Sequence, residues 1–193
     1  NTTDTTLQIA FDRALEAGQF AMAEQTLRQA ERIASGAADQ AQLERMRGRL
    51  AQAKGDTTAA ESHLAEAVDR AREAGRQDLL ARGWLADLGA VRSARGDHQA
   101  AQATLTEAVD TSHRLRGDGD WATVRALRLL AAAERALGNQ PAALAALQRA
   151  AVGADDARPT EPDVVRVVRR ELADALQAAG RADCDELLTE DLD

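Results

Sequence analysis

Histidine, cysteine and the carboxylates are the side chains from which a nucleophilic or metal-binding centre would be built, and this chain has three histidines and one cysteine. His63, His98 and His113 include no pair at the three- or four-residue spacing that puts two ligands on one face of a helix. Cys184 has no histidine near it in the sequence to act as its base, and a lone cysteine excludes an internal disulfide and a cysteine-rich zinc site. We therefore expect no catalytic residue and no metal site.

The motifs that bind nucleotides and calcium are also missing from the sequence. It contains neither G-x-x-x-x-G-K-[ST] nor a G-x-G-x-x-G that follows a strand. The phrase Gly117-Asp118-Gly119-Asp120 is rich in glycine and aspartate, as calcium loops are, but it lacks their ligand ladder and closing glutamate. We expect no cofactor and no enzymatic activity in this sequence, and a catalytic domain outside it is left open.

The composition is that of a folded helical protein. Of the 193 residues, 45% are hydrophobic and 29% are charged, whereas aromatic residues make up only 2% and tyrosine is absent. The abundant alanine, leucine, arginine, glutamate and glutamine favour helices over strands, so we expect an all-α fold. The net charge of −8 argues against nucleic-acid binding, and no apolar run reaches the roughly 18 residues of a membrane span. The first residue is Asn1 rather than Met, as expected for an excised domain or a processed product.

A glycine phrase recurs at regular intervals along the chain. In each copy the glycine is followed by alanine, leucine and alanine at fixed spacing. The copies are Gly18, Ala23, Leu27 and Ala30; Gly55, Ala60, Leu64 and Ala67; Gly96, Ala101, Leu105 and Ala108; and Gly138, Ala143, Leu147 and Ala150. Gly180 begins a degenerate fifth copy, and the intervals between the glycines are 37, 41, 42 and 42 residues. Each interval holds two helices and their turns, which predicts a series of helical hairpins.

The residues of each copy suit a turn between two packed helices. The glycine can take the left-handed conformation that ends a helix, and Asp56 or Asp97 after it can accept hydrogen bonds from the next helix's first amides. The alanines let paired helices approach closely, and the leucine one turn later fills the space between them. Trp84 lies on an apolar stripe and is expected in the core. For Trp121, which begins a helix beside a loop, a packed position and an exposed binding anchor are both left open.

This arrangement resembles the tetratricopeptide repeat. The small residue of that family's first helix corresponds to Gly48, Gly89, Ala131 and Ala173, with Phe11 in the first copy. The resemblance implies a right-handed α-solenoid of about five helical hairpins in a single domain, residues 1–193, with hairpins at about 4–35, 38–74, 77–115, 120–152 and 161–191. The intervals exceed the family's usual length of roughly 34 residues and are similar to those of kinesin-light-chain-type and bacterial regulator repeats. Loops are expected at 116–119 and at 153–163, which contains Pro159 and Pro162.

The resemblance also implies which first-helix positions line the concave side of such a stack. They are Thr5, Gln8, Asp12 and Leu15; Gln42, Arg45, Arg49 and Gln52; Gly83, Ala86, Ala90 and Ser93; Arg125, Arg128, Ala132 and Arg135; and Val167, Arg170, Asp174 and Gln177. Arginine dominates these positions, and a guanidinium binds a carboxylate through two parallel hydrogen bonds. We therefore predict that an acidic peptide binds in this groove, with the small residues of the third copy leaving room for a bulky group. The predicted site consists of Arg45, Arg49, Arg125, Arg128, Arg135, Arg170, Gln52 and Ser93, with Trp121 as an anchor.

A different interpretation of the groove arginines is that they form a solvated face. They would then be paired along their own helices with neighbours such as Glu44 and Glu134. A clamp for a terminal carboxylate, as in chaperone-binding members of the family, is disfavoured because Gln8 and Asp12 stand where its lysine and asparagine would be.

The function expected from the resemblance is a non-catalytic protein–protein interaction scaffold in a larger, cytoplasmic bacterial signalling or regulatory protein. The alternatives are a periplasmic location and a peptide-sensing domain that controls an attached kinase or transcription-factor domain. A homodimer through the first hairpin is also left open, because only the C-terminal end has a polar cap. That cap comprises Asp183, Asp185, Glu186, Glu190, Asp191 and Asp193.

Overall fold

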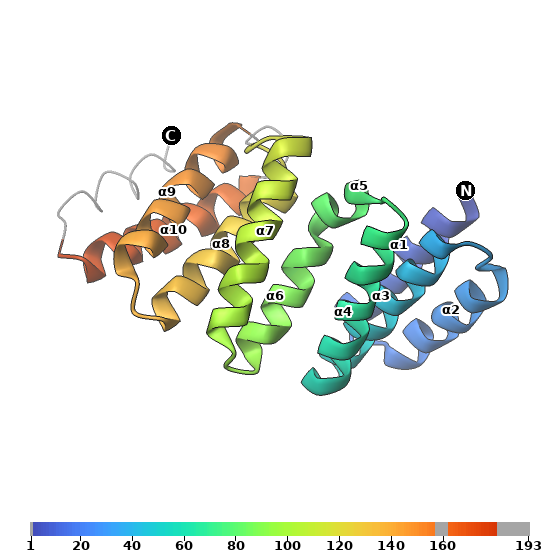
Figure 1. Cartoon of the computed structure of the whole chain (residues 1–193). Helices are drawn as coiled ribbons and strands as arrows, with labels where there is room; N and C mark the ends of the chain where they lie inside the picture. Colours follow the sequence, from blue (N-terminus) through green and yellow to red (C-terminus); the bar gives the residue numbers. More distant parts are fainter. Residues whose placement is uncertain (1, 157–161, 181–193) are drawn as a thin grey trace. The chain divides into compact units, whose positions relative to one another are not determined.

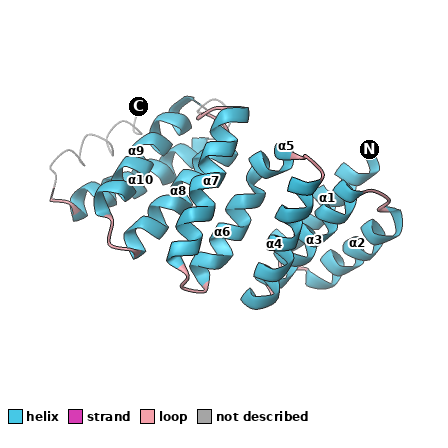
Figure 2. Ribbon diagram, viewed as in Figure 1, coloured by secondary structure: helices cyan, strands magenta, loops and turns pink. Residues whose placement is uncertain are grey.

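The computed structural model describes residues 2–156 and 162–180, and in these residues it contains helices, turns and loops without a strand (Figure 2). The predicted all-α fold class is therefore confirmed. The chain forms two compact units, residues 1–79 and 80–193. The expectation of a single domain stays a prediction. Cys184, the polar cap and the second helix of the fifth hairpin lie outside the described residues.

The first unit consists of two helical hairpins and a short helical turn. Its helices are α1 (Thr2–Glu16), α2 (Phe20–Ile33), α3 (Ala37–Ala53), α4 (Thr57–Glu73) and α5 (Gln77–Leu79) (Figure 1). A buried cluster joins the first three helices, with Phe11 fully buried among Leu27, Leu43, Met46 and Leu50. This apolar stripe is what the helical periodicity of the sequence predicts.

The second unit continues the pattern with a short π-helical turn, η1 (Leu80–Trp84), and five helices. They are α6 (Leu85–Ala94), α7 (His98–Arg116), α8 (Trp121–Ala136), α9 (Gln140–Asp156) and α10 (Pro162–Ala178). Trp84 is 3% exposed and belongs to the core, as predicted, whereas Trp121 is 43% exposed. None of the helices in the described part of the chain is long and apolar enough to cross a membrane.

The turns between paired helices have the predicted chemistry. Gly55 and Gly96 have φ values of +84°, which a residue with a side chain rarely adopts. The side chains of Asp56 and Asp97 then accept hydrogen bonds from the amides of Ala59 (3.0 Å) and Ala100 (3.1 Å). The predicted glycine and aspartate signals are confirmed at these two turns.

Small residues of the first helices receive large residues of the second helices. A Cβ added at Gly48 would lie 2.6 Å from Cγ of Leu64, and one added at Gly89 would lie 2.5 Å from Cγ of Leu105. Carbon atoms pack at about 3.5–4.0 Å, so neither glycine has room for a side chain unless the leucine moves. The predicted alternation of small and large residues thus sets how closely these helices approach.

Two features of the second unit differ from the sequence-based expectation. The first helix of the third hairpin is interrupted at Arg82 and Gly83, where Gly83 has a φ of +98°. The predicted loop at 153–163 is wrong for residues 153–156 and 162–163, because α9 continues to Asp156 and α10 begins at Pro162. Gly153 is buried inside that helix, where a Cβ would lie 2.3 Å from the carbonyl oxygen of Asp118. Gly153 does not end the helix. Because it has no side chain, the 117–120 loop can pack against α9 at this position.

Candidate partner-binding surface

The predicted groove arginines fall into two sets. Arg45 and Arg49 lie on α3 in the first unit, whereas Arg125, Arg128 and Arg135 lie on α8 and Arg170 lies on α10 in the second unit. Gln52 is exposed near the end of α3, and Ser93 is half-buried on α6. The predicted site residues therefore belong to two different units.

In the first unit, Arg49 is engaged within the chain. Its guanidinium donates to Oδ1 of Asp12 on α1. Arg45 is half-buried and also has a partner, so the predicted α3 arginines are not a bare cationic surface. The Arg49–Asp12 ion pair joins the first helices of the first two hairpins.

In the second unit, Arg125 fills the space that the small residues of the third copy were expected to leave open. Its Nη2 lies 2.8 Å from Oδ1 of Asp87, a carboxylate that is 4% exposed. Its Nη1 lies 3.3 Å from the position that a Cβ on Gly83 would occupy. Gly83 and Ala86 are buried, so the predicted room for a bulky group is wrong. The polar head of Arg125 occupies that space and neutralises the buried Asp87.

Arg128 is held by a two-point contact with Glu171 on α10. Its Nε donates to Oε2 over 2.7 Å and its Nη2 donates to Oε1 over 2.6 Å. This hydrogen bonding with Glu171 raises the pKa of Arg128 above its ordinary value. A planar guanidinium gripping both carboxylate oxygens is one of the strongest ion-pair geometries available. Arg128 is therefore part of the framework that joins α8 to α10.

These ion pairs share an arrangement that differs from both interpretations of the sequence. Within each unit they join one first helix to the next: α1 to α3, α6 to α8 and α8 to α10. Pairing along the same helix with Glu44 or Glu134 was the alternative interpretation, but those carboxylates have other roles. Glu44 contacts Arg47 and His63, and Glu134 accepts from Gln102 and Asn139. The sequence does contain one indication of these pairs. Asp87 and Glu171 each directly follow a predicted concave position, Ala86 and Arg170 respectively.

Two of the predicted arginines remain free to meet a partner. Arg135 and Arg170 are exposed, and neither forms an ion pair with any residue in ranges 2–156 and 162–180. Ala132 and Asp174 are exposed on the same stripes of α8 and α10. We call Ala132, Arg135, Arg170 and Asp174 the α8–α10 surface. It carries two unpaired cations against one unpaired carboxylate.

Two of the three histidines contact carboxylates of the same chain. His63 lies 2.8 Å from Glu44, and His113 lies 3.0 Å from Asp118. No group of three or more histidine, cysteine, aspartate or glutamate side chains among the described residues could hold a metal ion.

Comparison with known proteins supports the helical-repeat architecture. Residues 79–151 match the model of the tetratricopeptide repeat family. No curated protein matches the chain. Among solved structures, BtubC (BKLC) from P. vanneervenii is similar with a TM-score of 0.81, 17% identity and coverage of 96% of this chain and 76% of that one. A putative kinesin light chain from Podosopora anserina with nearly identical TPR-like repeats has a TM-score of 0.72, 20% identity and coverage of 95% and 90%. The predicted resemblance to tetratricopeptide repeats, including those of the kinesin-light-chain type, is confirmed.

Proposed function

We propose that this chain, which has the fold of tetratricopeptide-repeat proteins, is a non-catalytic protein-interaction module. Folds of this kind are generally scaffolds for protein–protein interaction, because stacked hairpins present extended surfaces built from successive helices. Ion pairs within the second unit join successive first helices. Asp87 and Arg125 neutralise each other and stabilise the framework.

The partner feature that best fits the α8–α10 surface is an acidic segment of a protein. The observation that carries this proposal is the exposure of Arg135 and Arg170 without an ion-pair partner in the described chain, which is otherwise acidic overall. Carboxylates of a partner would bind the two guanidinium groups through paired hydrogen bonds. The exposed carboxylate of Asp174 would repel an acidic residue of the partner placed next to it. The spacing of acidic residues in the partner would therefore contribute to specificity.

The remaining groove residues have different roles in this proposal. Arg49, Arg125 and Arg128 would have to give up a carboxylate of their own chain before binding one from a partner, so they position the helices. Arg45, Gln52, Ser93 and the exposed Trp121 stay predicted contact residues. The homodimer, bacterial signalling context and cytoplasmic location also stay predictions.

A charge-reversal experiment tests the acidic-partner proposal. A display library of acidic and neutral 15-residue peptides is selected on the full chain, and the tightest peptide is measured by fluorescence anisotropy at low and high salt. We expect acidic peptides to be selected, and Arg135→Glu/Arg170→Glu to weaken binding by at least tenfold. The control Arg13→Glu/Arg32→Glu makes the same charge change at exposed arginines of the first unit and should change affinity less than twofold. Equal losses in both variants would mean that only net charge matters, and no loss in either would reject this surface.

A further inference from the structure

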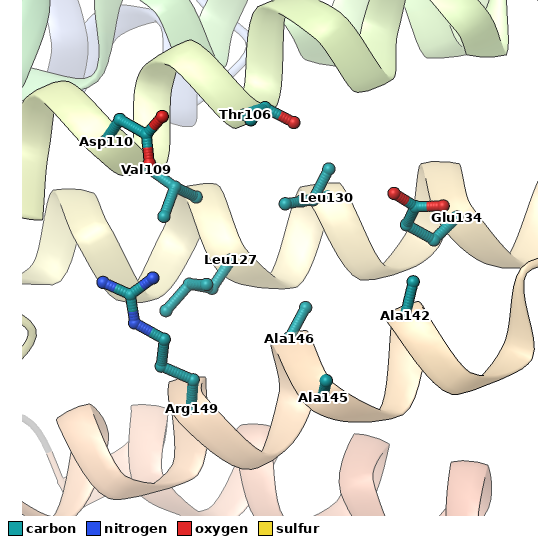
Figure 3. Close-up of a pocket in the computed structure, with 10 residues that line it drawn as sticks. All are labelled: Thr106, Val109, Asp110, Leu127, Leu130, Glu134, Ala142, Ala145, Ala146 and Arg149. Carbon is teal, nitrogen blue, oxygen red and sulfur yellow. The ribbon is translucent and has the colours of Figure 1, made fainter.

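A groove opens in the second unit between α7 and α9, with α8 as its floor (Figure 3). Its volume is about 350 Å³. The apolar lining consists of Val109, Leu127, Leu130, Ala142, Ala145 and Ala146. Leu127 and Leu130 lie on a different face of α8 from the stripe that carries Arg128 and Arg135. The groove is therefore separate from the α8–α10 surface.

The equivalent place in the first unit is closed by polar side chains. When the hairpins are aligned on Gly55 and Gly138, Leu127, Leu130 and Ala146 correspond to Glu44, Arg47 and His63. When the preceding second helices are aligned on Gly18 and Gly96, Val109 corresponds to Glu31. Four apolar side chains of the groove thus stand where the first unit has polar ones, whereas Ala142 corresponds to Ala59.

Those four polar residues form a network that spans three helices. Arg47 on α3 donates to Glu31 on α2 over 2.7 Å and also to Glu44 on its own helix. Glu44 in turn lies 2.8 Å from Nδ1 of His63 on α4. The network bridges α2, α3 and α4 at the positions that correspond to Val109, Leu130 and Ala146 in the second unit. Of these three residues Leu130 is half-buried, and Val109 and Ala146 are buried. Short alanines on α9 provide no side chain that could cover Leu130, which is only half-buried.

The ends of the groove carry acidic groups. Asp110 at the α7 rim is exposed and forms no ion pair with any residue that the structure describes. The nearby Arg149 is engaged by Asp118, with Nη2 2.7 Å from Oδ1. Toward the opposite end in Figure 3, both oxygens of Glu134 accept from neutral amides, those of Gln102 (2.7 Å) and Asn139 (2.8 Å). The groove is thus apolar along its length, with the exposed carboxylate of Asp110 at one end and the buried carboxylate of Glu134 at the other.

We propose that this groove binds the apolar face of an amphipathic helix from a partner protein, with a lysine or arginine of that helix beside Asp110. A helix fits because the apolar lining has few groups to bond a partner's backbone, and a helix satisfies its own amides and carbonyls. The basic residue follows from the unpaired carboxylate at the rim. This partner chemistry is opposite in charge to that proposed for the α8–α10 surface, so one scaffold would bind two different segments.

Selection from a defined peptide library tests the site. Sixteen-residue peptides with leucine at i, i+3, i+4 and i+7 and randomised flanking positions are displayed and selected on the full chain. The best peptide is then measured by fluorescence anisotropy. We expect selected peptides to carry lysine or arginine beside the leucine stripe and to be helical when bound. The Ala145→Trp protein, whose groove is filled, gives the background of the selection. The proposal would be overturned if the selected peptides had acidic flanking residues, or if no peptide were enriched above that background.

Two groove variants and two matched controls locate the binding site. Ala145→Trp fills the groove from an exposed position of α9, and Asp110→Lys reverses the rim charge. Each should weaken the selected peptide by at least tenfold. Ala132→Trp and Asp174→Lys make the same changes at exposed positions of the α8–α10 surface and should alter affinity less than twofold. Circular dichroism verifies that each variant is folded. Equal peptide affinity in all four variants would mean that the peptide binds elsewhere and would overturn the proposal. Arg135→Glu/Arg170→Glu should leave this peptide's affinity unchanged, which keeps the two proposed surfaces distinguishable.

Discussion

Asp87 and Arg125 form an ion pair of 2.8 Å that joins α6 to α8 while the carboxylate is 4% exposed. The guanidinium packs over Gly83, at the point where the first helix of the third hairpin is interrupted. A glycine without a Cβ lets the arginine reach the buried acid. The break in the helix and the position of the ion pair are thus features of one local arrangement.

Removing the cation of this pair should destabilise the second unit strongly. Arg125→Leu leaves the Asp87 carboxylate buried without its guanidinium partner, and we expect a loss of about 3 kcal/mol in the free energy of unfolding. Urea unfolding followed by tryptophan fluorescence reports on this unit, because both tryptophans of the chain lie in it. Arg135→Leu, an exposed arginine on the same helix, should cost about 0.5 kcal/mol or less. Equal losses in the two variants would show that the pair contributes nothing specific.

The stability of the second unit should fall when the charge of Arg128 is reversed and recover when the charges of Arg128 and Glu171 are exchanged. Arg128→Glu places two carboxylates together across α8 and α10, and we expect a loss of about 2 kcal/mol, since the pair is partly exposed. The exchanged variant Arg128→Glu/Glu171→Arg should recover most of that loss in the same urea experiment. A double variant as unstable as the single one would mean that the two residues do not interact in solution. Arg128→Glu alone is therefore an unsuitable probe of partner binding.

The close packing of Gly89 against Leu105 predicts a coupled pair of substitutions. Gly89→Ala adds a Cβ 2.5 Å from Cγ of Leu105, which should destabilise the second unit by about 1–3 kcal/mol. In the double variant Gly89→Ala/Leu105→Ala the new methyl group has room, so the total loss should be smaller than the sum of the single losses. Thermal unfolding of the four proteins measures this coupling. Additive losses would contradict the direct contact.

Local signals in the sequence were sufficient to predict the helical hairpins. A turn glycine followed by Asp56 or Asp97 depends only on neighbouring residues, and the structure has both caps. The break at Gly83 could not be predicted in this way, because a single glycine is tolerated inside many helices. Gly153 shows the converse error. It was interpreted as a loop residue, but its role is to accommodate the carbonyl of Asp118, which is distant in sequence.

The candidate site was predicted less completely because its electrostatics depend on neighbouring hairpins. The arginine positions were implied by the resemblance to tetratricopeptide repeats. The carboxylates that pair with Arg49, Arg125 and Arg128, however, lie on another first helix, 37 to 43 residues away in the sequence. Leu130 is half-buried, and nothing local in the sequence indicates that α9 leaves it only partly covered. The groove depends on side chains from three helices, α7, α8 and α9, and no local sequence pattern specifies how they meet.

Asp118 should make stability depend on pH in the acidic range. Hydrogen bonding to Arg149, with a further contribution from His113, lowers the pKa of Asp118 below its ordinary value. Because the pKa is lower in the folded than in the unfolded state, the stabilisation is present above about pH 4 and is lost as pH falls through the folded pKa. Asp118→Asn should thus reduce the free energy of unfolding by about 1 kcal/mol at pH 7, the pair being partly exposed.

The pH profile distinguishes the charge of Asp118 from its place in the loop. Urea unfolding between pH 2 and 7 should show the difference between the wild-type chain and Asp118→Asn shrinking below about pH 4, where the carboxylate of the unfolded chain becomes protonated. The difference should be lost once the pH is below the lowered pKa of Asp118 in the folded chain. Asp110→Asn removes an exposed carboxylate that has no ion pair in the described chain, and its profile should follow the wild type throughout. A constant difference at every pH would mean that Asp118 acts by packing the 117–120 loop against α9. In that case the ion pair with Arg149 would contribute geometry without charge stabilisation.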